Sequence, residues 1–111
     1  MILETQPYKD LHGAPEVRLE FCIPNMPLDG TGRIVLTYTP HKHVVDTQVL
    51  NDWVQNMGKK NYTTWEDFAT AVIDAFYDTV LPRKVDLNYF LILTNDMTHN
   101  ITLTRSQPVM R

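Results

Sequence analysis

The chain has 111 residues, of which 43% are hydrophobic and 21% are charged, and its formal net charge is -3. This length predicts one domain spanning residues 1–111, with a core modest enough that oligomerisation would add stability. The acidic balance argues against a dedicated nucleic-acid-binding domain, because such domains carry an excess of Lys and Arg to neutralise phosphates.

The single cysteine, Cys22, excludes a disulfide within the chain. No apolar stretch reaches the roughly 20 residues needed to cross a membrane, and Met1 to Leu3 are followed at once by Glu4 instead of a signal-peptide core. We therefore expect a protein of a reducing cytoplasmic compartment, without a membrane partner.

The N-terminal half predicts two strands. Residues 1–15 are expected to be irregular because proline and glycine interrupt them. Residues 17–23 alternate between apolar and polar side chains, which is typical of a half-buried strand, with Cys22 on the polar side. The stretch 24–32 is rich in Pro and Gly and predicts a loop. Residues 33–39 are rich in β-branched side chains and predict a second strand.

Two helices are expected next, because apolar residues recur at helical spacing over 49–57 and again from Trp65 to Val80. Gly58 is expected to close the first and Pro82 to stop the second. Thr63 with Glu66 three residues later resembles a capping box. Two further strands are expected at the ranges 85–94 and 100–104, and the tail 106–111 is expected to be irregular.

This order predicts an α+β fold in which a four-stranded antiparallel sheet has two consecutive helices on one face. A helix pair inserted between two hairpins, ββααββ, resembles the tunnelling fold. The resemblance implies that several subunits join their sheets into a barrel and that active sites lie at subunit boundaries. We therefore expect a homo-oligomer with sites at its interfaces.

Four features resemble the 7-cyano-7-deazaguanine nitrile reductase family, and they cover about two-thirds of the chain, in agreement in both order and separation. The first is Cys22 with Asp29 seven residues later, the family's spacing of nucleophile and acidic partner. The others are Tyr38-Thr39-Pro40 at the end of the second strand, Val45-Asp46-Thr47-Gln48-Val49-Leu50 at the start of the first helix, and Trp65-Glu66 with Leu81-Pro82-Arg83 at the two ends of the second helix.

The resemblance implies an enzyme acting on the nitrile of 7-cyano-7-deazaguanine through a Cys22 thioimide. A thiolate can add to an electrophilic nitrile carbon, which divides one difficult step into two easier ones. Asp29 is the expected proton shuttle. Glu66 is the expected anchor of the guanine-like edge, because one carboxylate accepts two N–H donors, and Asp46 and Trp65 are further candidates for substrate binding.

Each of these residues has a plainer alternative. Cys22 can be a small buried hydrophobic residue, although its strand face argues against this. Asp29 can be a turn residue and Asp46 an N-cap. Glu66 can belong to the capping box, and Trp65 can be a core residue on the apolar helix stripe.

Some departures from the family lie near the expected site: Ile23 follows Cys22 where the family has Pro, the loop between Asp29 and Tyr38 is one residue longer, and Trp65 replaces a base-flanking His. The others concern its cofactor. The family's default reaction is NADPH-dependent reduction to 7-aminomethyl-7-deazaguanine, and the lysines that bind NADPH there are Gln48 and Asn51 here. Short relatives that also lack this motif add ammonia to the nitrile of a modified tRNA base. An amidinotransferase of this type is the first alternative function, and a non-catalytic purine- or pterin-binding protein is the second. The substrate is then a free base or the same base within a nucleic acid.

His41 and His43 form a His-x-His pair of the kind that the zinc-bearing relatives of the tunnelling fold carry. A zinc site needs at least one further ligand, so the pair is interpreted as a loop feature and no metal is expected. Lys59 and Lys60, between the helices, are expected to lie on the solvated surface.

Overall fold

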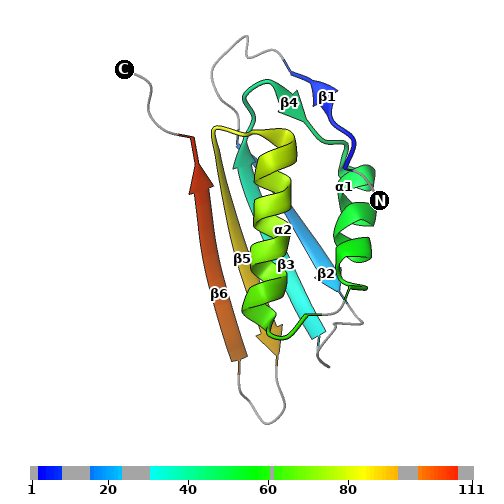
Figure 1. The fold of residues 1–111 in the computed structure, drawn as a ribbon, viewed down its shortest axis with the longest axis vertical. Coiled ribbons are helices and arrows are strands. Elements are labelled where there is room, and N and C mark those ends of the chain that lie inside the picture. Colours follow the sequence, from blue (N-terminus) through cyan, green and yellow to red (C-terminus); the bar gives the residue numbers. More distant parts are fainter. Residues whose placement is uncertain (1–2, 9–15, 24–30, 61, 93–97, 108–111) are drawn as a thin grey trace.

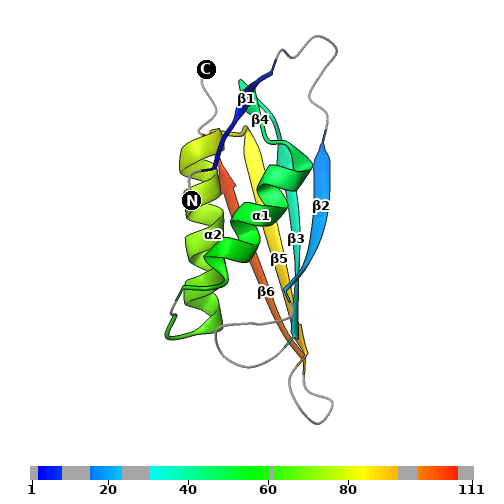
Figure 2. The ribbon, with the colours of Figure 1, turned by 90° about the vertical axis from the view of Figure 1, so that its right-hand side faces the viewer.

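The computed structural model describes residues 3–8, 16–23, 31–60, 62–92 and 98–107. Four strands form one antiparallel sheet in the order β2-β3-β5-β6. These strands are β2 (Val17–Ile23), β3 (Thr31–Thr39), β5 (Lys84–Ile92) and β6 (Thr98–Ser106). Helices α1 (Thr47–Met57) and α2 (Trp65–Val80) follow each other between β3 and β5. Both helices lie on one side of the sheet, so the molecule has two layers (Figures 1 and 2). The expected α+β fold with ββααββ order is confirmed.

The core lies between the helices and the facing side of the sheet. The apolar helix stripes predicted from their spacing are buried, including Leu50 and Trp53 of α1 and Phe68, Val72 and Phe76 of α2. On the sheet, alternate residues such as Phe21, Ile34, Leu36, Val85 and Leu87 complete this core. Burial of apolar surface between the two layers is the main stabilising term of such a fold.

The opposite side of the sheet, which we call the open face, is covered by no helix or strand among the described residues (Figure 2). Because side chains alternate along a strand, the partners of the core residues point to this side. The strand registers assign the following residues to the open face: Arg18, Glu20, Cys22, Arg33, Val35, Thr37, Thr39, Lys84, Asp86, Asn88, Phe90, Thr98, Asn100, Thr102, Thr104 and Ser106.

Three boundary predictions are wrong. Residues 6–7 form β1 (Gln6–Pro7), which pairs with β4 (His43–Val44), although 1–15 was expected to be irregular. β3 begins at Thr31, within the predicted loop, because Thr31 and Gly32 find partners on β5. β6 runs to Ser106, and the Gln107 N–H donates to the Arg83 carbonyl at 3.0 Å. In each case pairing with a distant strand overrides the local composition.

The end of α2 adopts a strained backbone conformation. Leu81, the C-cap, has φ 52 and ψ 53, which is the left-handed region, and its backbone N–H donates to the Tyr77 carbonyl. Pro82 follows and prevents the helix from continuing. A residue with a Cβ in this region costs roughly 1–2 kcal/mol.

Replacing Leu81 with glycine tests this strain. The side chain of Leu81 is 49% exposed, so little packing is lost. Leu81→Gly is expected to raise the free energy of unfolding by up to about 1 kcal/mol, since glycine's extra freedom in the unfolded chain offsets part of the relief. Leu81→Ala keeps the Cβ and is expected to give no gain. Urea denaturation of both variants measures the difference, and equal stability would contradict the strain.

Candidate functional site

Cys22 lies near the end of β2, the strand at one edge of the sheet, and it is exposed. Its neighbour Phe21 is buried in the core, so the thiol points to the open face, away from the helices. The alternative of a buried, hydrophobic cysteine is therefore wrong. Gln55 of α1 donates from Nε2 to the Cys22 carbonyl at 3.0 Å, which holds the backbone of this strand end against the helix.

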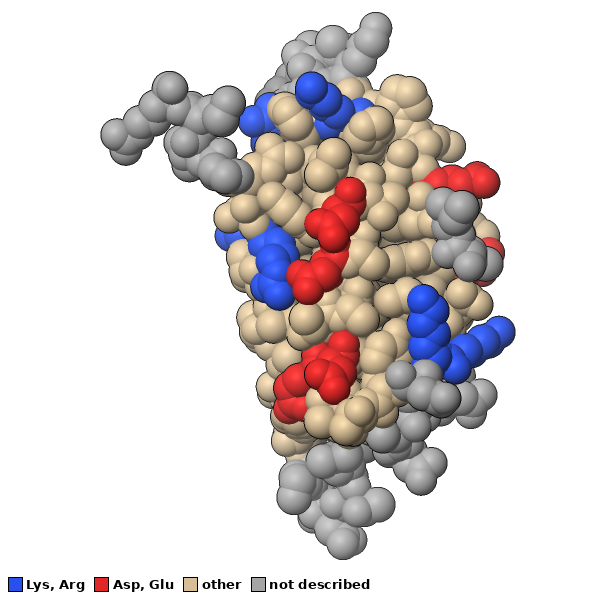
Figure 3. Space-filling model, viewed as in Figure 1, with Lys and Arg blue, Asp and Glu red and all other residues tan. Residues whose placement is uncertain are grey.

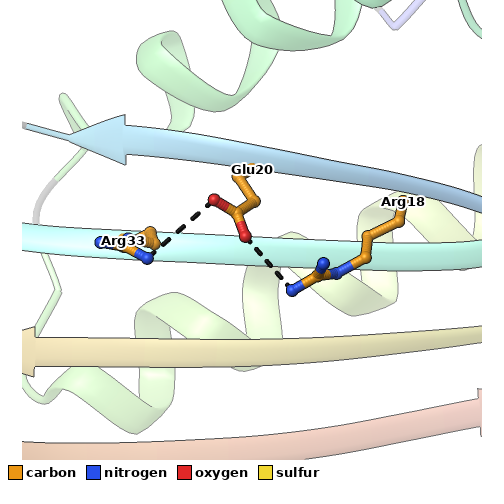
Figure 4. A network of polar contacts seen from close by, with 3 residues as sticks. All are labelled: Arg18, Glu20 and Arg33. Atoms are coloured by element: carbon orange, nitrogen blue, oxygen red, sulfur yellow. Dashed lines mark hydrogen bonds and ion pairs between the residues drawn. The ribbon is translucent and has the colours of Figure 1, made fainter.

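Charged side chains surround the thiol on the open face. Arg33 lies directly opposite Cys22 on β3. The Glu20 carboxylate lies between two guanidinium groups, 3.2 Å from Arg18 and 4.0 Å from Arg33 (Figure 4). All three side chains are largely exposed, so these pairs add little to stability, of the order of 0–1 kcal/mol each. The strand register places Arg33 opposite Cys22, and the surroundings on this face are polar and exposed to solvent.

Asp29, the expected proton shuttle, lies outside the described residues. Its role stays a prediction from the sequence spacing.

Glu66 lies in the first turn of α2, and the capping-box prediction for it is wrong. The N-cap of α2 is Thr64, whose Oγ1 accepts a hydrogen bond from the Asp67 N–H at 3.1 Å. The cap is thus one residue later than the predicted Thr63. Glu66 instead pairs with His99 of β6, with 3.3 Å between Oε1 and Nε2. Its carboxylate is 57% exposed, so a ligand can reach it.

Asp46 and Trp65 have local structural roles. Asp46 is the N-cap of α1, and its Oδ2 accepts from the backbone N–H groups of Gln48 at 3.1 Å and Val49 at 3.3 Å. Trp65 opens α2 and packs at the margin of the core, its ring 6.0 Å from that of Tyr89. Both plainer alternatives are thus realised, and neither excludes contact with a ligand, since Asp46 is exposed and Trp65 is only partly buried.

The Tyr38-Thr39-Pro40 motif connects the sheet to the first helix. The buried Tyr38 hydroxyl accepts the Val45 N–H at 3.4 Å, immediately before the Asp46 cap. Burial raises the pKa of Tyr38, so its hydroxyl stays neutral. This motif therefore positions the start of α1 and does not touch the open face.

The structure does not bring Cys22 and Glu66 together within one chain. Cys22 points to the open face, whereas Glu66 lies on the helix side of the sheet, beside β6 at the opposite edge. Asp46 and Trp65 also lie on the helix side. A site that contains both the thiol and the Glu66 carboxylate requires a second copy of the chain.

The residues that replace the family's cofactor-binding lysines offer no cation. Gln48 donates from Nε2 to Asp52 at 3.0 Å, and Asn51 lies on the same helix. α1 contains neither Lys nor Arg. A 2′-phosphate needs fixed cationic donors, which in this position would have to come from another part of the protein or from a neighbouring subunit.

His41 and His43 lie around the short strand β4. His43 pairs with Pro7 in the two-stranded sheet, and the His41 Nδ1 is buried with no hydrogen-bond partner among the described residues. No group of three His, Cys, Asp or Glu side chains with metal-binding geometry occurs in the described part of the chain. Within the same residues, no helix is long and apolar enough to span a membrane.

Acidic side chains run along the outer surface of α2 (Figure 3). They are Glu66, Asp67, Asp74 and Asp78. Lys59 and Lys60 are exposed, as expected, after the end of α1. Acidic side chains repel a phosphate backbone, although Asp74 is paired with Arg105 at 2.8 Å.

Reasoning from the sequence missed three residues. His99, the partner of Glu66, had no supporting context in its own segment. Arg33 and Phe90 lie in the same row across the open face as Cys22, and their positions follow only from the strand registers. Alternation along each strand was the available signal, but it does not say which residues of different strands are opposite each other.

Two threonine variants test the assignment of Thr64 as the N-cap of α2. Thr64→Ala removes the acceptor of the Asp67 N–H and is expected to lower the free energy of unfolding by about 1 kcal/mol. Thr63→Ala is expected to change it by a few tenths at most. Chemical denaturation of both variants decides between them, and a larger loss for Thr63→Ala would restore the predicted capping box.

The sequence matches none of the protein-family models and none of the curated proteins with which it was compared. The fold is therefore shown by the structure alone, and the family resemblance depends on the motifs quoted above.

Proposed function

We propose that the chain is an enzyme that uses Cys22 as a nucleophile on the nitrile of 7-cyano-7-deazaguanine. The observation that supports this most is the exposure of the thiol on a polar sheet face, beside Arg33. Sulfur bonds to the nitrile carbon, the triple bond becomes a double bond, and the nitrogen takes up a proton to give a thioimide. In this proposal Asp29 supplies that proton.

The second step is where the two enzymatic candidates differ. Reduction with NADPH is what the resemblance implies, but α1 provides no cation for this cofactor. This observation favours the amidinotransferase reaction. Ammonia attacks the thioimide carbon, the C–S bond breaks, and the Cys22 thiolate leaves with an amidine as the product.

The outer strands of the sheet support assembly into a homo-oligomer. Gln107 and Arg83 lie opposite each other where the β5–β6 pairing continues, and the Gln107 N–H donates to the Arg83 carbonyl. Because hydrogen-bonded pairs alternate along an antiparallel ladder, the helix-facing residues of β6 are the ones whose backbone groups bond to β5. The same alternation applies to each pair of neighbouring strands in turn. At the outer edges of β2 and β6, the backbone groups that point away from the sheet therefore belong to residues of the open face. The Cys22 carbonyl, accepting from Gln55, fits the pattern because it points outward from β2.

β2 of one copy and β6 of another can pair so that the helices of both copies lie on the same side of the joined sheet. Because the sheet has four antiparallel strands, β2 of one copy meets β6 of the next in antiparallel orientation, and the contact repeats head to tail. Cys22 and Asn100 lie in one row across the sheet. An unstaggered junction therefore places Asn100 of one copy beside Cys22 of the next on the open face, while the His99–Glu66 pair stays on the helix side of the joined sheet.

Intact-mass spectrometry tests the first step. Incubation with 7-cyano-7-deazaguanine is expected to add the full mass of the ligand to the wild-type chain, because addition to a nitrile releases no leaving group. Cys22→Ala is expected to show no adduct at any ligand concentration. An adduct that persists in Cys22→Ala, or none in the wild type, would contradict the proposal.

The same preparation separates the two second steps. Ammonium is expected to release the amidine and regenerate the free thiol, while NADPH absorbance stays constant. A fall in NADPH absorbance with an aminomethyl product would instead assign the chain to the reductases.

A further inference from the structure

One row of side chains crosses the whole open face at the level of the thiol. Cys22 is opposite Arg33, Arg33 is opposite Phe90, and Phe90 is opposite Asn100. The row thus joins a nucleophile, a guanidinium group, an aromatic ring and an amide, one from each strand. All four side chains are exposed.

Phe90 is an exposed aromatic residue on a mostly polar sheet face. It is 42% exposed, whereas the large side chains that face the helices, such as Tyr89 and Leu91, are buried. The remaining open-face residues are mostly charged, Thr or Asn. Among the open-face residues whose side chains are described, the other apolar one, Val35, is only 4% exposed and lies diagonal to Phe90 on β3. Phe90 and Val35 form an apolar centre with a polar rim, and the exposed ring contributes nothing to the core between sheet and helices.

An exposed aromatic ring on an antiparallel sheet is a surface on which a flat heterocycle can stack. The spacing of the row suits such a ligand. Directly opposite residues of antiparallel strands are about 4.5–5.5 Å apart between Cα atoms, so Cys22 and Phe90 are separated by about 10 Å. A bicyclic ring on Phe90 can direct a short linear substituent past Arg33 toward the thiol.

We propose that the open face holds the ring of the substrate, with Phe90 as its stacking surface and Arg33 and Asn100 as polar contacts to its edge. This inference rests on the proposed function and names the residues that would bind its substrate on the side of the sheet where the nucleophile lies. The Arg33 guanidinium can donate to a ring carbonyl, and the strand register places Arg33 opposite Cys22. The Asn100 amide both donates and accepts.

Substitutions of Phe90 test the stacking contact. Phe90→Leu keeps an apolar side chain and removes the ring, and Phe90→Tyr keeps the ring. Leu81→Ala is the matched control, because it truncates an exposed apolar residue at the other end of α2 from Glu66. The readout is the concentration of 7-cyano-7-deazaguanine that gives half-maximal adduct on Cys22 by intact mass.

Phe90→Leu is expected to raise this concentration about fivefold or more, since stacking on one aromatic ring is worth about 1–3 kcal/mol. Phe90→Tyr and Leu81→Ala are expected to stay near the wild-type value. Unchanged half-saturation in Phe90→Leu would overturn the stacking proposal while leaving the chemistry of Cys22 intact.

A binding measurement separates failure of the two proposals. Guanine, which has no nitrile, is titrated into isotope-labelled wild type and Phe90→Leu, and amide shifts are followed by NMR. Shifts at Arg33, Phe90 and Asn100 in the wild type that are lost in Phe90→Leu support the open-face site, even if no adduct forms on Cys22. Shifts confined to the helix side, around Glu66, or no shifts at all, overturn it.

Discussion

One constraint organises the molecule: only one face of the four-stranded sheet is covered by helices. Every strand residue therefore lies in the core or on the open face according to its parity along the strand. Phe21 and Cys22 are neighbours in the chain, yet one is buried and the other exposed. A shift of one residue in the register of β2 would exchange these roles, bury the thiol and expose the core.

The same constraint divides the functional residues expected from the sequence into two groups. Cys22 belongs to the open face, while Glu66, Asp46 and Trp65 belong to the helix layer. A single chain thus carries these residues on opposite sides of its sheet. A junction between β2 of one copy and β6 of the next brings Asn100 beside Cys22 but leaves Glu66 on the helix side. The open-face row is the arrangement in which a ring would bind on the same side of the sheet as Cys22.

The resemblance and the structure support each other unevenly. The Tyr38 motif connects β3 to α1 through the Val45 N–H, and the Asp46 position caps α1, so both serve the fold directly. The Cys22 position serves no packing role, which is why it bears on function. Gln48 and Asn51, where the resemblance expects cofactor-binding lysines, lie on a helix without Lys or Arg.

Local patterns in the sequence determined the strand Val17–Ile23, the two amphipathic helices and the exposure of Cys22, because alternation and helical periodicity report which side of an element is buried. Tertiary structure alone decided the pairing of Gln6–Pro7 with His43–Val44, the contact of Glu66 with His99 and the row that joins Cys22 to Phe90. These depend on register and packing between residues far apart in the chain, and local periodicity contains no information about either. Even the cap of α2 moved from Thr63 to Thr64, because the backbone geometry at the helix start, which composition does not specify, decides which hydroxyl reaches the free N–H groups.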